Sequence, residues 1–123
     1  DSYPDRFFNV GSSEMAALGI CVGLATEKKL PFFYSITPFA LYRPFEIIRN
    51  YLDHESIKVN IVGGGRDKDY GHLGFSHWAT DDATIMSSFK NIKLFRPQTE
   101  EDLEKDWVAI LASDKATYLN LKK

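Results

Sequence analysis

The sequence contains a single cysteine, Cys21, so no disulfide can form within the chain and a reducing compartment is expected. It contains no apolar run that approaches the roughly 18 residues of a membrane span, and no signal peptide. Its formal net charge is only −2, which gives no reason to expect a nucleic acid or an anionic membrane as a partner. These absences lead us to expect a globular protein in the cytoplasm.

The composition that is present is typical of one globular domain. Hydrophobic residues make up 44% of the chain and charged residues 26%. At 123 residues the chain is long enough for a single domain, to which we assign residues 1–123. The sequence does not begin with Met, and its first residues, DSYPDR, are typical of a loop inside a protein. We therefore expect a fragment, a processed piece or one part of a larger protein.

Segments with strand and helix patterns alternate along the chain. This alternation predicts an α/β fold with a mainly parallel sheet and helices on both faces. The apolar run at 30–36 is typical of a central strand, and the helix at 13–28 is apolar on most faces, so we expect it to be buried on several sides. The expected strands are 6–10, 30–36, 57–63, 92–97 and 116–121, and the expected helices are 13–28, 39–53, 81–89 and 99–113.

Three features fall near the carboxyl ends of expected strands, where α/β sheets bind ligands. A lone acid, Glu14, stands at the start of an otherwise apolar helix. Phe39, Tyr42 and Phe45 recur every three residues, a spacing that places them on one helical face, where they either pack in the core or line a pocket. A loop rich in glycine and histidine covers 63–77. Together these features are suited to one flat aromatic ligand, which the residues alone do not identify.

The loop at 63–77 matches no specific motif by itself. Its glycines fit neither GxxxxGK[ST] nor a GxGxxG that opens a helix, so a phosphate site is only weakly indicated. His72 and His77 stand five residues apart without a convincing third ligand, so no metal site is expected. An ordinary nucleotide-binding domain that uses this loop stays open as an alternative.

Four segments of the chain, in the same order, resemble transketolase-type enzymes. They are PDRFFNVGSSEMAALGICVGLA, PFFYSITPFALYRPFEIIR, IKVNIVGGG with YGHLGFSHWATDDATIM, and NIKLFRPQTEEDL. They cover nearly the whole chain, which is thus identified as a member of the pyrimidine-binding domains of thiamine diphosphate enzymes of the transketolase group. The resemblance implies the thiamine diphosphate-binding fold, here without the family's first strand and helix.

The resemblance assigns catalytic roles to Glu14 and His77. In the family, the carboxyl that matches Glu14 bonds a ring nitrogen of the cofactor's aminopyrimidine, which favours the imino tautomer that activates the thiazolium carbon. His77 matches a histidine near the substrate carbonyl. Phe39, Tyr42 and Phe45 match the aromatic pocket for the pyrimidine ring, with Tyr42 best placed for stacking.

The resemblance also bears on the substrate. Arg43 and Arg66 match positions that are sometimes basic in the deoxyxylulose-phosphate synthase branch, where they face substrate phosphate. Leu73 stands where the family commonly has an acid that contacts a substrate hydroxyl. Because an apolar side chain cannot orient a sugar hydroxyl, the usual pentose phosphate is not the expected substrate. The alternatives are a transferase that takes another sugar or a 2-oxo acid, and a diverged, non-catalytic interaction or regulatory module.

Finally, the resemblance implies partners. The G-D-G…N motif that holds Mg²⁺ and diphosphate is absent from this sequence and lies on a separate domain in the family. Magnesium is therefore expected on a diphosphate-binding partner domain or subunit rather than on this chain. Because the family's catalytic centre usually forms between protomers, a homo-oligomer such as a dimer is expected. The resulting prediction is a cytoplasmic, transketolase-like transferase of carbohydrate metabolism, without nucleic-acid or membrane partners.

Overall fold

A four-stranded parallel sheet organises the computed structural model, which describes residues 2–123. The strands pair in parallel in the order β1-β2-β4-β3. The α/β fold predicted from the sequence is therefore confirmed. The strands are β1 (Phe32–Ile36), β2 (Asn60–Gly64), β3 (Ile92–Phe95) and β4 (Ala116–Leu121), and the α-helices are α1 (Glu14–Thr26), α2 (Thr37–Leu41), α3 (Phe45–Ile47), α4 (Asp82–Ser87) and α5 (Glu100–Ala112).

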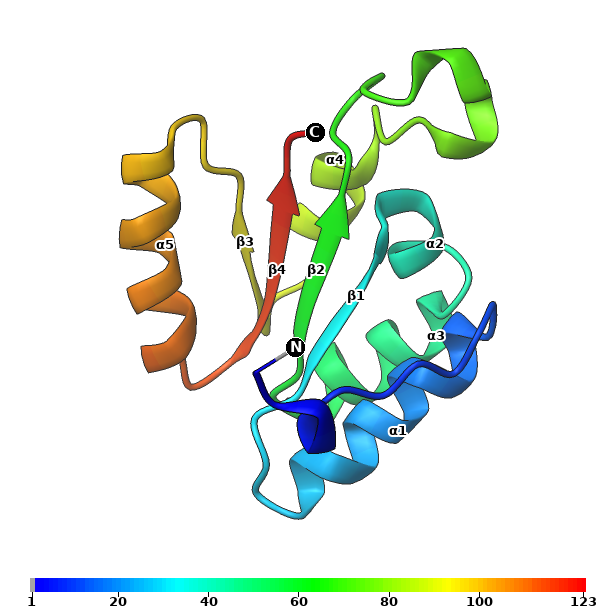
Figure 1. Ribbon diagram of the computed structural model, residues 1–123. Coiled ribbons are helices and arrows are strands. Elements are labelled where there is room, and N and C mark those ends of the chain that lie inside the picture. The colour runs from blue at the N-terminus through cyan, green and yellow to red at the C-terminus, as the bar shows by residue number, and fades with distance from the viewer. Residues whose placement is uncertain (1) are drawn as a thin grey trace.

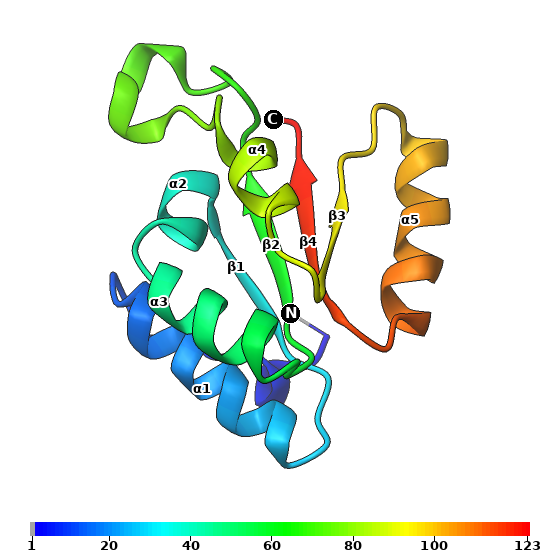
Figure 2. The same ribbon diagram turned by 180° about the vertical axis from the view of Figure 1, so that it is seen from behind.

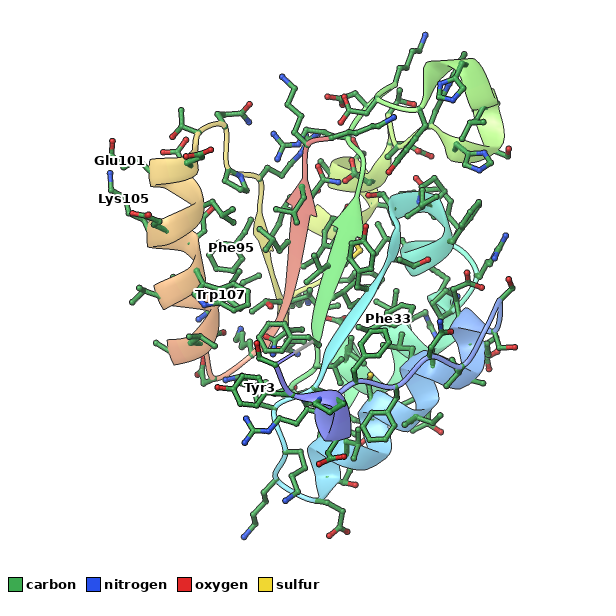
Figure 3. The ribbon with its side chains drawn as sticks, in the orientation of Figure 1. Tyr3, Phe33, Phe95, Glu101, Lys105 and Trp107 are labelled. Atoms are coloured by element: carbon green, nitrogen blue, oxygen red, sulfur yellow. The ribbon has the colours of Figure 1, made fainter. Side chains whose placement is uncertain are left out.

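Helices cover both faces of the sheet, as predicted. The helices α1 to α4 lie on one face and α5 lies alone on the other (Figure 1 and Figure 2). Phe33, Ile61 and Tyr118, from three neighbouring strands, are buried together in the core under α1 to α4. Figure 3 shows Phe95 and Trp107 on the other side, between the sheet and α5. The sheet thus separates a closed core from a more open face.

The strand expected at 6–10 is absent from the part of the chain described, so this prediction is wrong. Pro4–Arg6 form a short 3-10 helix, and the residues that follow it pair with no strand of the sheet. Phe7 and Phe8, which produced the strand pattern, are 66% and 68% exposed. The position expected for β1 is also wrong: within residues 2–123 it lies at the edge of the sheet, because β2 is its only strand partner there.

Helix α1 forms where the sequence predicts it, but within residues 2–123 it is not buried on several sides as expected. Ser13 is its N-cap residue, without a side-chain capping bond. Leu18 and Cys21 are buried, whereas Met15 and Ile20 on the same helix are half-exposed. The reason is that α1 packs on β1 and α3 along one face only.

The helix predicted at 39–53, in which Pro44 is expected to bend or delay the start, is broken into short pieces. The helix α2 ends at Leu41, α3 starts after Pro44, and a π-helix, η2, continues over Ile48–His54. Pro44 explains the interruption, because its ring removes a backbone donor and clashes with the preceding helical turn. In contrast, α5 matches its prediction, since Thr99 and Asp102 form a reciprocal capping box at its start.

The helix α5 leaves part of its sheet face uncovered. Phe32 stacks on Trp107 with ring centroids 5.2 Å apart, and an apolar groove continues beside this pair. The groove is lined by Phe32, Tyr34, Val62, Leu103, Trp107 and Leu121. These apolar side chains are accessible at the surface. Separately, no helix within residues 2–123 has the length and apolar character needed to cross a membrane.

Candidate functional site

Glu14 lies at the start of α1, where it forms an ion pair with Arg43. Nη1 of Arg43 donates to both carboxylate oxygens at 2.8 Å. The two partners differ in exposure: the Glu14 side chain is 11% exposed and the Arg43 side chain 47%. The acid is therefore shielded from water on most sides, while the cation that covers it stays in contact with solvent.

The Arg43 guanidinium lowers the pKa of this acid. Its hydrogen bond is the largest influence on Glu14 and holds the pKa of that carboxyl below its ordinary value. Burial acts in the opposite direction and raises the pKa. With Arg43 in place, Glu14 is a carboxylate at neutral pH. Removing the arginine takes away the largest influence that lowers this pKa.

Aromatic contacts connect this ion pair to the histidine of the glycine-rich loop. Cζ of Arg43 lies 3.9 Å from the centroid of the Phe39 ring. The ring of His77 also contacts Phe39, edge-on, at a centroid distance of 5.0 Å. Nδ1 of His77 lies 3.0 Å from the hydroxyl of Ser76. Four residues singled out in the sequence, Glu14, Phe39, Arg43 and His77, therefore form one contiguous set of contacts.

Tyr42 and Phe45, which recur with Phe39 every three residues, have partners of their own. The Tyr42 hydroxyl donates to Oδ1 of Asp81 at 2.5 Å. Burial, and then the bond to Asp81, raise the pKa of Tyr42, so it is a neutral phenol. Phe45 packs on Phe89 with ring centroids 5.7 Å apart. Of these three rings, Phe39 is the one that lies against the Arg43 side chain.

Arg66 lies in a buried set of polar side chains at the carboxyl ends of the strands. Its side chain is only 3% exposed. Its Nε donates to Oδ1 of Asn120 at 2.6 Å, and its Nη2 donates to the carbonyl oxygen of Pro97 at 2.9 Å and to that of Asn120. This burial argues against the substrate contact expected for Arg66.

Asn120 links Arg66 to the core. Its amide nitrogen donates to Oγ1 of Thr37 at 3.1 Å and to the hydroxyl of Tyr118 at 2.9 Å. The Tyr118 hydroxyl donates in turn to Oδ2 of Asp82 at 2.6 Å. We call Thr37, Arg66, Asp82, Tyr118 and Asn120 the buried network, since all are at most 3% exposed.

The glycines of the loop are explained by close packing. A Cβ on Gly63 would lie 2.5 Å from Oγ1 of Thr37, and one on Gly64 would lie 2.8 Å from the Tyr34 hydroxyl. Gly65 has φ +86° and would place a Cβ 2.3 Å from the Tyr70 ring. These glycines let the chain pass tightly between side chains, a role that needs no phosphate.

Sequence reasoning missed the roles of the two acids at the start of α4. The sequence predicts only that Asp81 and Asp82 open a helix, but each accepts a hydrogen bond from a tyrosine hydroxyl. The signal available in the sequence is an acid pair at a helix start, in a chain whose parallel sheet brings strand ends together. It does not reveal which tyrosines approach these acids.

The residues around Glu14 suit a flat ring with N–H donors. The planar Arg43 group directs N–H groups at the Glu14 carboxylate and its face at the Phe39 ring. An aminopyrimidine is likewise flat and carries an amino donor, so Glu14 and Phe39 fit that part of thiamine diphosphate. Within residues 2–123, no three His, Cys, Asp or Glu side chains gather in a way that suits a metal ion.

Comparison with known proteins identifies the family of this chain. The model of the transketolase pyrimidine-binding domain matches residues 1–123. A protein from Methanocaldococcus jannaschii, whose name contains the words transketolase C-terminal section, is 37% identical over 77% of this chain and 30% of its own length. One of the subunits of the apulose-4-phosphate transketolase of Actinobacillus succinogenes is 30% identical over 81% of this chain and 32% of its own length.

A solved structure gives the same answer in three dimensions. It is described as a split gene transketolase, inactive beta4 tetramer, and is 29% identical to this chain. The match covers 98% of this chain and 38% of the solved one, with a TM-score of 0.85. This chain therefore spans about a third of the length of the relatives it matches. Because the family model covers the whole chain, the protein belongs to the transketolase pyrimidine-binding domain family.

Proposed function

We propose that this chain is the pyrimidine-binding half of a thiamine diphosphate-dependent, transketolase-like transferase. The observation that carries the proposal is the shielded Glu14 carboxylate, which the flat guanidinium of Arg43 links to the Phe39 ring. Thiamine diphosphate, when bound, supplies a carbon that takes up the transferred ketol or aldehyde group. Everything else in the proposal concerns what the residues of this chain do around it.

Glu14 binds and holds a proton in this proposal. Its carboxylate accepts a hydrogen bond at the position now filled by Arg43 and shares a proton with a ring nitrogen there. Burial supports this role, because it acts to raise the pKa of Glu14. Phe39 orients the ring by face contact, a kind of contact worth about 1 kcal/mol beyond its area burial. Tyr42 is held by its hydrogen bond to Asp81, and Phe45 anchors the segment on Phe89.

His77 and Arg43 are proposed as the substrate contacts. His77 lies against the same Phe39 ring, so it borders the place assigned to the cofactor. Arg43 is half-exposed and carries a charge suited to an anionic substrate group. Arg66 is given a positioning role instead, because its guanidinium is buried and bonded to Asn120 and Pro97.

The chain needs a partner to complete the site. The relatives that it matches are about three times as long, and they include proteins named as subunits or sections of transketolases. The exposed apolar side chains of α1 and of the groove beside α5 are suited to a protein partner. We propose that residues 1–123 are one part of a larger oligomeric enzyme, whose diphosphate-binding domain or subunit carries the Mg²⁺.

Glu14→Gln in the assembled enzyme tests the proposal. The amide keeps the shape of the side chain but cannot share the proton, so turnover should fall by at least about 100-fold. Calorimetric titration should show that the variant still takes up thiamine diphosphate with magnesium, but more weakly. Glu46→Gln is the matched control, since Glu46 is an exposed acid at the start of α3, and it should keep full turnover.

The same experiment separates the enzyme from a non-catalytic module. Leu73, exposed at the end of a 3-10 helix, is the residue that favours the module, because it cannot orient a substrate hydroxyl. If the wild-type assembly takes up no thiamine diphosphate, the module is supported and the enzyme proposal fails. Near-normal turnover of the Glu14→Gln variant would show that Glu14 is only structural.

A further inference from the structure

Arg43 fills the space between the Glu14 carboxylate and the Phe39 ring. Its Nη1 donates to both carboxylate oxygens at 2.8 Å, and its Cζ lies 3.9 Å from the ring centroid. These resemble the two contacts proposed above for the aminopyrimidine: a hydrogen-bonding edge toward the acid and a flat face toward the ring. We propose, on the basis of that function, that Arg43 is an internal stand-in for the aminopyrimidine, which the cofactor must displace.

The Arg43 side chain can leave without disturbing the fold. Nearly half of it is exposed, so the guanidinium gains water as it leaves the acid. It follows the end of α2 and precedes Pro44, so its backbone belongs to a turn between two short helices. Ion pairs with one solvated partner contribute little to stability. Displacement therefore requires only a rotation of the Arg43 side chain.

A purely structural ion pair makes the opposite prediction. Such a pair would fix the start of α1 against the turn after α2 and so preserve the shape of the site. Its loss would weaken cofactor binding. A stand-in, in contrast, competes with the cofactor, because the site is free only in the fraction of molecules in which Arg43 has left Glu14. Its loss must tighten cofactor binding.

Calorimetric titration of thiamine diphosphate with magnesium into the assembled enzyme distinguishes these two roles. Arg43→Ala should lower the Kd by about fivefold, because the competing side chain is gone. Arg49→Ala is the matched control: Arg49 is an exposed arginine of the same chain segment, bonded to Asn50, and its loss should leave the Kd unchanged. An unchanged or higher Kd for Arg43→Ala overturns the proposal.

A second pair of variants separates competition from simple relief of positive charge. In a Glu14→Gln background, Arg43 no longer has a carboxylate to occupy, so adding Arg43→Ala should change the Kd by less than about twofold. If the roughly fivefold gain persists in that background, charge alone explains it and the stand-in is disproved. The failure of the function itself looks different: the wild-type assembly would then take up no thiamine diphosphate.

Discussion

The Glu14–Arg43 pair and the buried network are polar clusters of opposite construction. The pair joins one shielded acid to one half-exposed arginine. The network places Arg66 and its partners almost wholly inside the protein, where Asn120 bonds to three other side chains of the cluster. Each cluster contains an arginine that the sequence marks as a candidate substrate contact. The arginine of the pair is half-exposed and can exchange its partner for water, whereas Arg66 is buried.

This difference separates a scaffold from an exchangeable site. Removing one member of a buried polar cluster leaves its partners without hydrogen bonds in a water-poor interior, which strongly destabilises a protein. Removing one member of a solvated pair allows water to replace it. We therefore expect substitutions in the buried network to lower the free energy of unfolding. Substitutions in the Glu14–Arg43 pair should instead change cofactor binding and turnover.

Arg66→Met should have the largest effect on stability. The shorter, apolar side chain cannot bond Oδ1 of Asn120 or the carbonyl oxygen of Pro97, and both acceptors belong to buried residues. The free energy of unfolding should fall by about 3 kcal/mol, measured by urea unfolding of the assembled protein. Arg49→Met, at an exposed position, should change it by less than about 0.5 kcal/mol. Equal midpoints for the two variants would show that burial of Arg66 is not what stabilises this end of the sheet.

Tyr118→Phe should have a smaller effect in the same direction. It removes one hydroxyl, which donates to Oδ2 of Asp82 at 2.6 Å and accepts from Asn120 at 2.9 Å. Because the ring remains, no large cavity forms, and the loss should be about 2 kcal/mol. Tyr51→Phe on the half-exposed part of η2 serves as the control and should be near neutral. A loss no larger than that of the control would contradict the role of Asp82 as a buried acceptor.

Local signals in the sequence predicted some elements closely. The helix predicted at 99–113 is found at Glu100–Ala112, where Thr99 and Asp102 form a capping box at its start. The strand β4 has the predicted bounds of 116–121. Signals of this kind act within a few residues. The strand predicted at 6–10 failed because a strand must also pair with a neighbour, and residues 6–10 pair with no strand within residues 2–123. The edge position of β1 is likewise decided by pairing, which the apolar run at 30–36 does not encode.

The candidate site shows the same limit. The resemblance pointed to Glu14, Phe39 and His77, and the structure brings these residues together. The contact between Glu14 and Arg43 joins side chains 29 residues apart, and no local pattern predicts it. The burial of Arg66 depends on Asn120, 54 residues further on, at a neighbouring strand end. The identity of such partners is a property of the assembled sheet.

The smallest expected effect on stability is that of Arg43→Ala, and its pH dependence sharpens the comparison. Arg43 lowers the pKa of Glu14 in the folded protein. A carboxyl with a lowered folded pKa stabilises the protein above its unfolded pKa, and this stabilisation is lost as the pH falls through the folded value. Urea unfolding at pH 7 should therefore show a loss of less than about 1 kcal/mol for the variant. This difference should fade as the pH drops below about 4.5, the ordinary value for Glu14.

The size of this loss matters more than its sign. A pair that contributes less than about 1 kcal/mol can be opened by a ligand of ordinary affinity, whereas a cluster worth about 3 kcal/mol resists exchange. High salt should shrink the Arg43→Ala loss further, because the guanidinium is half in water and its charge is screened there. If Arg43→Ala instead destabilised the protein as much as Arg66→Met at pH 7, both clusters would be scaffold. Arg43 would then bind Glu14 too firmly for a cofactor to displace the arginine.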